Sequence, residues 1–530
     1  MNLAEKVAQM VVVRASGYLF DNQIRYPDWE PPTSKLKYWL QDLGVGGVIF
    51  VGGSAVDLAT HIQQLQSWAK TPLLLAADIE EGVGQRFAGA TWFPAPMAIA
   101  AVAQTNPTKA QKYAEIMGSI TAQEALAIGL NWILAPVVDV NNNPDNPVIN
   151  IRAFGETPAI VGQLATAFIR GAQKYPVLTT AKHFPGHGDT AVDSHFELPV
   201  LPHSESRLAE VELPPFIEAI AAGVDSVMSA HLLIPAWDTE LPATLSQKIL
   251  TGQLRQRLSF TGLVVTDALV MGAVANRYGL AEASVLAVEA GADILLMPLD
   301  AEVTIKAVCD AVSQGRISES RIDESLQRIW QVKAKVYPNW QPGGERKLEQ
   351  TFTSTFDLSE KLDGPLAQKT VAEILQDSLK VRGYLTPDVD DKYLRNLIVV
   401  EDMLNNAFLG NHTPAIAIPK TFGYQPQIID SNSEIPHNQD PNRLTLLQLF
   451  IRGNPFGRLS RLTQASQDLL KKLLTNTELK GLIIYGSQYT LEQFLPDLPS
   501  DIPYVFCYGQ MPKAQAIALE LLLKKFPTSF

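Results

Sequence analysis

One stretch of fourteen residues, KHFPGHGDTAVDSH from Lys182 to His195, holds three of the chain's eight histidines and two aspartates. Imidazole titrates near neutral pH, so such a cluster predicts proton transfer or the binding of a polar ligand. Asp193 and His195 are two residues apart. A carboxylate that accepts one imidazole N–H leaves the other ring nitrogen to carry protons. The pair is therefore a candidate general acid/base, and an ordinary polar loop is the alternative.

The same stretch has a spacing that suggests a metal site. His183 and His187 are four residues apart, as in a zinc-binding helix. Pro185 and Gly186 lie between them, and proline breaks a helix because it lacks the N–H donor. We therefore expect a constrained turn in which His187 is a hydrogen-bonded brace. No metal or cofactor is predicted.

Charged or titratable residues end five of the eight short apolar runs in the first 340 residues. The residues at these ends are Asp78, Asp139, Lys182 with His183, His231 and Asp267. Asp139 is followed by VNNNPDNP and fits either a cap or turn role or a place in a site. Asp267 follows a buried-strand pattern, so we expect its carboxylate to project from the strand end. A nucleophilic carboxylate and a separate proton-transfer group are what double displacement at an acetal carbon requires.

The elements that must position these groups alternate regularly. Eight β-branched runs are separated by amphipathic segments with helical spacing. The runs begin at Met10, Gly46, Pro72, Trp132, Pro176, Asp225, Gly262 and Ala292. Nearly continuous apolar strands indicate a parallel sheet covered on both faces, and eight of them predict a (β/α)8 TIM barrel. An open doubly wound sheet is the alternative.

The chain is expected to contain two domains. Periodicity is lost near residue 340, where proline, glycine and charge gather, so we predict a catalytic barrel over 1–340 and a linker over 341–362. Beyond the linker, apolar runs and helical segments alternate again. They predict a smaller C-terminal α/β sandwich domain over 363–530.

Composition excludes several classes of partner. The net charge is −12 and no basic stripe is present, so nucleic acid is not an expected partner. No apolar run reaches the roughly 18 residues of a membrane span, and the N-terminus lacks an export signal, so we predict a cytoplasmic protein without a membrane partner. The two cysteines are expected to be free thiols. The oligomeric state stays open.

KHFPGHGDTAVDSH and FTGLVVTDALVMGA together resemble glycoside hydrolase family three, specifically its bacterial β-N-acetylglucosaminidases. The similarity extends over the first 340 residues through ADIEEGVGQRF, LAPVVDVNNNP, NIRAFGETP and VMSAHLLIPAWD. The resemblance implies that Asp267 is the nucleophile, that His195 is the general acid/base and that Asp193 orients His195. It also implies four residues that hold hydroxyls of the terminal sugar, namely Asp78, Arg152, Lys182 and His183.

The implied function is that of a retaining exo-β-N-acetylglucosaminidase, with muropeptides or related β-glycosides as the carbohydrate substrate and no cofactor. The alternatives are a β-glucosidase or β-xylosidase of the family, a phosphorylase, a metal-dependent hydrolase, and a silent sugar-binding protein. A neutral imidazole does not repel phosphate as a carboxylate base would, which keeps phosphorolysis open. The acid/base lies within the barrel, so the terminal domain is expected to be accessory.

Three positions depart from the family's pattern. Glu81 stands before Gly82 where a second glycine is common, Ala268 replaces an aspartate after the nucleophile, and Thr157 replaces an acidic residue. These positions lie close in sequence to the proposed reactants and binding residues. We therefore expect them to bear on sugar preference more than on mechanism.

Overall fold

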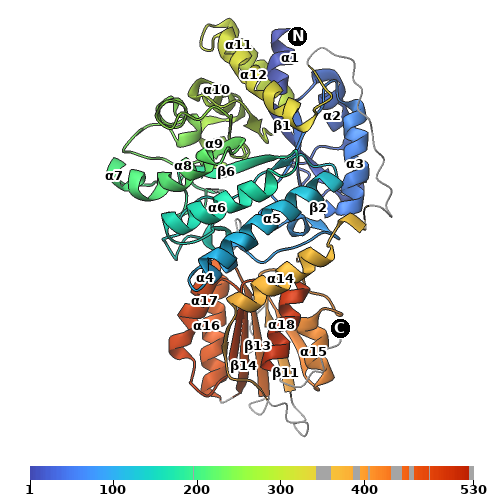
Figure 1. Cartoon of the computed structure of the whole chain (residues 1–530), viewed down its shortest axis with the longest axis vertical. Coiled ribbons are helices and arrows are strands. Elements are labelled where there is room, and N and C mark those ends of the chain that lie inside the picture. Colours follow the sequence, from blue (N-terminus) through green and yellow to red (C-terminus); the bar gives the residue numbers. More distant parts are fainter. Residues whose placement is uncertain are drawn as a thin grey trace. The chain divides into compact units, whose positions relative to one another are not determined.

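The computed structural model describes residues 1–194, 196–341, 358, 360–385, 394–403, 406, 408–430, 444–452, 459–476 and 478–523. The chain forms two compact units (Figure 1). The first contains Met1–Phe93, Thr108–Asn143 and Ala153–Gln368, and the second contains Pro94–Pro107, Pro144–Arg152 and Lys369–Phe530. The boundaries expected from the sequence stay a prediction.

The first unit is built on a parallel sheet with the strand order β8-β7-β6-β5-β3-β2-β1-β9. A parallel bridge between Val265 and Ile294 joins its two ends, and the short strand β4 pairs with β2. The strands are β1 (Val11–Gly17), β2 (Gly47–Ser54), β3 (Leu74–Ala77), β4 (Phe87–Ala88), β5 (Trp132–Ile133), β6 (Leu178–Phe184), β7 (Ser226–Ser229), β8 (Leu263–Val265) and β9 (Leu295–Leu296). This nearly closed sheet confirms the predicted barrel and excludes the open alternative.

The alternation of strand and helix follows from the apolar pattern. Every residue of β1 is buried, as expected of a strand between the barrel interior and a helical layer. Helix α3 begins where the Ser54 hydroxyl accepts the N–H of Asp57, and it buries Leu58, Ile62 and Leu65 on one face. The helices around the barrel are α1 (Leu3–Gln9), α2 (Thr33–Tyr38), α3 (Ala55–Trp68), α5 (Pro107–Ala127), α6 (Pro158–Ala172), α7 (Glu205–Arg207), α8 (Leu213–Ala221), α9 (Gly272–Tyr278), α10 (Leu280–Ala290), α11 (Ala301–Ser313) and α12 (Glu319–Val336).

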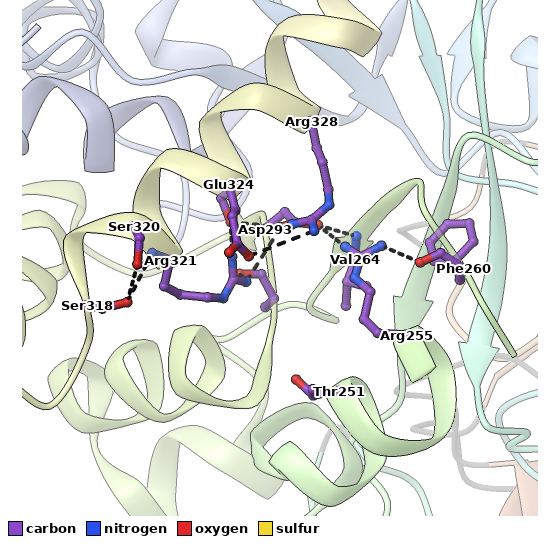
Figure 2. Close-up of polar contacts among 12 residues, drawn as sticks. Thr251, Arg255, Phe260, Val264, Asp293, Ser318, Ser320, Arg321, Glu324 and Arg328 are labelled. Carbon is purple, nitrogen blue, oxygen red and sulfur yellow. Dashed lines mark hydrogen bonds and ion pairs between the residues drawn. The ribbon is translucent and has the colours of Figure 1, made fainter. Parts of the chain in front are cut away.

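The amino-terminal ends of the strands carry a buried ionic cluster, which we call the amino-rim cluster, centred on Asp293 just before β9 (Figure 2). The Asp293 carboxylate is fully buried and pairs with Arg255 of the π-helical segment η7 (Lys248–Arg257). Arg328 of α12 lies 3.1 Å from Asp293 Oδ1, and Arg321 of α12 lies 3.5 Å from it. The Val264 N–H also donates to the carboxylate at 3.0 Å. Burial lowers the pKa of Arg255 to about 10, against the attraction of Asp293.

The second unit has a six-stranded sheet with the order β10-β15-β14-β13-β11-β12, in which only the β10–β15 pair is antiparallel. Its strands are β10 (Lys380–Arg382), β11 (Leu394–Val399), β12 (Gln425–Ile429), β13 (Leu444–Ile451), β14 (Leu479–Gly486) and β15 (Tyr504–Cys507). Its helices are α4 (Pro96–Ala103), α14 (Pro365–Ser378), α15 (Pro414–Thr421), α16 (Leu459–Thr475), α17 (Gln488–Phe494) and α18 (Pro512–Leu522). This layered sheet confirms the predicted second α/β region.

Both cysteines carry free thiols, and burial raises the pKa of Cys507 to about 12. Among the described residues, none of the helices combines the length and the apolar character needed to cross a bilayer.

Candidate active site

The carboxyl ends of the parallel strands place the predicted polar residues along one rim of the barrel. Asp78 follows β3, Lys182 and His183 lie in β6, and Asp267 follows β8. The Val137–Lys182 bridge brings the segment that leads to Asp139 beside β6. In barrels of this type, the loops at the carboxyl rim build the active site. We call this polar set the carboxyl-rim site.

Lys182 lies between two carboxylates at this rim. Its ammonium is 2.7 Å from Asp78 Oδ1 and 2.7 Å from Glu80 Oε1. The side chains of Lys182 and Glu80 are almost completely buried, whereas the Asp78 side chain is 30% exposed. The buried Lys182 ammonium thus fixes the Asp78 carboxylate, which is partly exposed to solvent at the rim. Such a pair suits a polar ligand that needs both an acceptor and a fixed charge.

Sequence reasoning missed Glu80 and overlooked a difference between it and its neighbour. Glu80 pairs with Lys182, whereas the Glu81 carboxylate accepts the indole N–H of Trp92 at 2.9 Å. Glu81 is buried, and its backbone carbonyl also accepts the N–H of Phe93 at 2.8 Å. The second glutamate of ADIEEG is therefore used to fix the chain around Trp92.

Asp139 organises the turn that follows β6. Its carboxylate accepts the backbone N–H of His183 at 3.1 Å and that of His187 at 2.6 Å, and it contacts His183 Nδ1 at 2.8 Å. Burial favours the protonated acid, but the imidazoles of His183 and His187 and these N–H donors outweigh it and hold the pKa of Asp139 below its usual value. Asp139 therefore has the turn role that the sequence left open, and it also fixes the His183 ring; its place in a sugar-binding site stays a prediction.

His187 is braced on both sides of its ring. Nδ1 lies 2.8 Å from the Thr190 hydroxyl, and Nε2 lies 3.1 Å from the Ser194 hydroxyl. Burial lowers the pKa of His187 to about 4, although the carboxylates of Asp139 and Asp267 act in the opposite direction. The ring is therefore neutral at pH 7. Within the part of the chain that the structure describes, no group of three His, Cys, Asp or Glu side chains could hold a metal ion.

Polar contacts hold together the two ends of the segment that follows His187. The Asp189 carboxylate lies 2.9 Å from His203 Nε2 and 3.3 Å from Arg207 Nη2, and Arg207 also pairs with Glu212 at 2.7 Å. We call the contacts among Asp189, His203 and Arg207 the loop clasp. It brings together residues that are 14 positions apart in the chain.

Asp193 lies inside the segment that the clasp joins. Its backbone carbonyl accepts the N–H groups of Phe196 and Glu197, each at 3.1 Å. The neighbouring Ser194 is buried against His187. His195 lies outside the described residues, so its pairing with Asp193 stays a prediction.

Asp267 lies two residues beyond the end of β8. Its Oδ1 accepts the N–H of Ala268 at 2.7 Å, and the side chain is close enough to His187 to act on the pKa of that imidazole. His231, which follows β7, contacts the Ala268 carbonyl at 3.1 Å. Asp267 therefore lies on the same rim as His183 in β6 and His187 in the turn that follows, two strands away in the sheet order.

Arg152 belongs to the second compact unit. It ends the 3-10 turn η4 (Asn150–Arg152), is 8% exposed and donates from Nη1 to the Val148 carbonyl at 2.9 Å. Its predicted contact with the sugar stays a prediction.

Comparisons with known proteins bear on both regions. The glycosyl hydrolase family 3 N-terminal domain matches residues 2–332, and the bacterial glycosyl hydrolase family 3 C-terminal domain matches residues 389–524. The chain is 33% identical to beta-hexosaminidase A of Pseudoalteromonas piscicida over 61% of this chain and 58% of that protein. It is 32% identical to a beta-N-acetylglucosaminidase/beta-glucosidase of Cellulomonas fimi over 57% of this chain and 54% of that protein.

A solved structure resembles the chain over nearly its whole length. It is the family 3 beta-N-acetylglucosaminidase of Paenibacillus sp. str. FPU-7, with a TM-score of 0.77 and 29% identity over 99% of this chain and 97% of that one. The two curated relatives, in contrast, are matched over little more than half of their own length.

Proposed function

We propose a function from one premise: this chain belongs to glycosyl hydrolase family 3. The proposed activity is the release of terminal N-acetylglucosamine from β-glycosides, with retention of configuration and a covalent glycosyl-enzyme. The observation that carries the proposal is the placement of Asp267, which follows β8, on the same barrel rim as the turn fixed by Asp139 after β6. It puts a carboxylate on the same rim as polar groups that are already held by the protein.

Asp267 is the proposed nucleophile. As the glycosidic bond breaks, positive charge develops on the sugar ring, and a carboxylate stabilises this charge before it bonds to the anomeric carbon. The Ala268 N–H donates to one carboxylate oxygen and so favours the ionised form that attacks. In the second step water displaces the carboxylate, and the configuration is retained.

The proposed acid/base is His195, oriented by Asp193. It first donates a proton to the leaving oxygen and then removes one from water. An imidazole with an ordinary pKa of ~6.5 does both near neutral pH. His187 is a poor candidate for this work because burial keeps it neutral and both of its ring nitrogens are hydrogen-bonded.

Sugar hydroxyls are proposed to bind Asp78, Lys182, His183 and Arg152. The Lys182 ammonium, fixed by Glu80, and the His183 ring, fixed by Asp139, offer donors in set orientations. Asp78 offers an acceptor at the exposed edge of the site. Preorganised groups of this kind bind a polar ligand without a further loss of side-chain freedom.

The finer proposals are a muropeptide substrate and a cytoplasmic location. They follow from the resemblance to the bacterial β-N-acetylglucosaminidases. A second candidate is β-glucosidase activity, because the Cellulomonas fimi relative carries both activities in its name.

A panel of aryl glycosides, read together with the anomeric form of the first product, tests the proposal. The β-N-acetylglucosaminide should be cleaved fastest, with the β-anomer released first. Preference for the β-glucoside would favour the second candidate, release of the α-anomer would exclude a retaining mechanism, and a sugar 1-phosphate formed in phosphate buffer would indicate phosphorolysis.

Asp267→Ala tests the nucleophile within the same assay. We expect kcat to fall by roughly 10⁴-fold or more, as the loss of a nucleophile typically causes. Asp310→Ala is the matched control, because Asp310 is an exposed aspartate of α11 in the outer helical layer. An Asp267→Ala variant with the wild-type kcat would overturn the assignment.

A further inference from the structure

The turn after β8 is held at more than one point. Ala268 donates its N–H to Asp267 Oδ1 at 2.7 Å. The Ala268 carbonyl accepts the Met271 N–H at 3.0 Å and contacts His231 Nε2 at 3.1 Å. A carbonyl oxygen has two lone pairs, and both are used here. The residue beside the proposed nucleophile is therefore fixed through its N–H and its C=O.

His231 reaches this turn from the neighbouring strand β7 and is fully buried. Its Nδ1 lies 2.8 Å from the Thr244 hydroxyl, which in turn lies 2.9 Å from the Ser229 hydroxyl. Because a carbonyl only accepts, the hydrogen must be on Nε2 when this atom bonds to Ala268. The Thr244 hydroxyl also lies 3.0 Å from the Ala230 carbonyl, and its single hydrogen can serve either that carbonyl or Nδ1. When it donates to Nδ1, it holds the side of the ring opposite the Nε2 donor.

We propose that His231 is a positioning residue that sets the orientation of the Asp267 carboxylate through Ala268. The inference rests on the proposed function, since it assigns Asp267 as the nucleophile. The chain of contacts runs from the Thr244 hydroxyl to the imidazole, from the imidazole to the Ala268 carbonyl, and from the Ala268 N–H to the carboxylate. Loss of the imidazole donor releases one side of the turn.

A direct catalytic role for His231 does not fit its environment. The residue has no exposed surface, and both ring nitrogens contact protein groups. Its effect must therefore pass through the turn. A shift of about 1 Å in a reacting group can cost about 100-fold in rate, so a small movement of the carboxylate is enough to be measured.

Two amide substitutions separate the two contacts of the ring. His231→Gln places its amide nitrogen near the position of Nε2 and can still donate to Ala268. His231→Asn places its amide near the position of Nδ1 and keeps only the contact with Thr244. The measurement is the first-turnover release of dinitrophenolate from an activated aryl β-N-acetylglucosaminide, together with kcat, KM and the midpoint of thermal unfolding.

We expect His231→Ala and His231→Asn to slow the first turnover by about 10- to 100-fold, with KM within about twofold of the wild type. His231→Gln should recover most of this loss. Equal rates for the Gln and Asn variants would overturn the proposal, as would a loss of thermal stability without a change in first-turnover rate. His61→Gln is the control, because His61 is a buried imidazole of α3 that the site does not use.

Thr244→Val keeps the test decisive if the His231 variants do not fold. It retains the imidazole but removes the hydroxyl that holds Nδ1, so we expect a smaller loss of about 3- to 10-fold in first-turnover rate with KM unchanged. An unchanged rate in Thr244→Val would then overturn the proposal. Failure of the proposed function looks different, because the wild type would release no sugar or Asp267→Ala would remain active.

Discussion

The two rims of the barrel use buried charge in different ways. In the amino-rim cluster, three guanidinium groups, a serine hydroxyl and a backbone N–H all address the Asp293 carboxylate. In the carboxyl-rim site, Lys182 is shared between Asp78 and Glu80, and Asp78 stays partly exposed. Because protein groups surround the Asp293 carboxylate, the amino-rim cluster can only hold secondary structure elements together. A cluster with an exposed acceptor can also receive a ligand.

The difference extends to the groups that hold each cluster. Arg255 and the α12 arginines come from helices and tie them to the strand start at Asp293. Asp139 instead binds the backbone and ring of the turn after β6. The amino rim therefore fastens secondary structure elements to one another, whereas the carboxyl rim sets the directions of individual side chains.

Removing the central carboxylate of the amino rim should have the largest effect. We expect Asp293→Ala to lower the free energy of unfolding by about 3 kcal/mol, because it leaves three partly buried guanidinium groups without the fully buried carboxylate that they share. The activity of each folded molecule should stay unchanged. Chemical denaturation and active-site titration measure the two quantities, and a loss of activity per folded molecule would remove the contrast between the rims.

Lowering the pH should reduce the free energy of unfolding through His187 of the carboxyl rim. Its pKa is lowered from about 6.5 to about 4, so the unfolded chain binds the proton first and stability falls as the pH drops from 6.5 toward 4. The loss approaches about 3 kcal/mol. His187→Gln should flatten the stability curve in this pH interval. A curve as steep as that of the wild type would mean that other groups dominate the acid transition.

Asp139→Asn is expected to reduce kcat/KM by roughly 100-fold, or about 2.7 kcal/mol, because an amide NH2 group would face the N–H donors of His183 and His187. The matched change at the other rim is Asp293→Asn, which should affect stability but leave kcat/KM intact. Steady-state kinetics on both variants give the comparison. The prediction is wrong if the two variants lose activity equally.

An ion pair on the surface shows how much an exposed charge contributes to stability, for comparison with both rims. Lys306 and Asp310 form an i,i+4 pair on α11 in which both side chains are more than half exposed. We expect Lys306→Ala to leave the free energy of unfolding nearly unchanged, because water and salt screen an exposed ion pair. A larger change in a denaturation experiment at moderate salt would show that surface charge also matters to the fold.

The barrel and much of its carboxyl rim were predictable from the sequence because their signals are local. Each strand is a short apolar run, and Asp78, Lys182 and Asp267 stand at or just beyond the ends of such runs. Glu80 was missed because its partner Lys182 is far away in the chain and the neighbouring Glu81 looks identical in sequence. Only the fold separates the two glutamates.

The amino-rim cluster left no readable pattern in the sequence. Its arginines stand at positions 255, 321 and 328, in two helical segments, and each looks like an ordinary surface residue of an amphipathic helix. Asp139 was ambiguous for a related reason. A carboxylate that caps a local turn and one that joins several distant groups both appear in the sequence as an acidic residue at a strand end. The two roles differ in their N–H donors, which for Asp139 lie more than 40 residues later in the chain.

The loop clasp has a consequence for how this part of the chain can vary among related proteins. Because Asp189 and His203 are held together, the entropy cost of closing the segment between them changes only slowly with its length. The segment can thus vary in length between these two anchors at little entropic cost, provided that it keeps Asp193 and His195, the residues proposed for proton transfer. The clasp thus separates the length of this segment, which can change, from the two residues that the proposed chemistry requires.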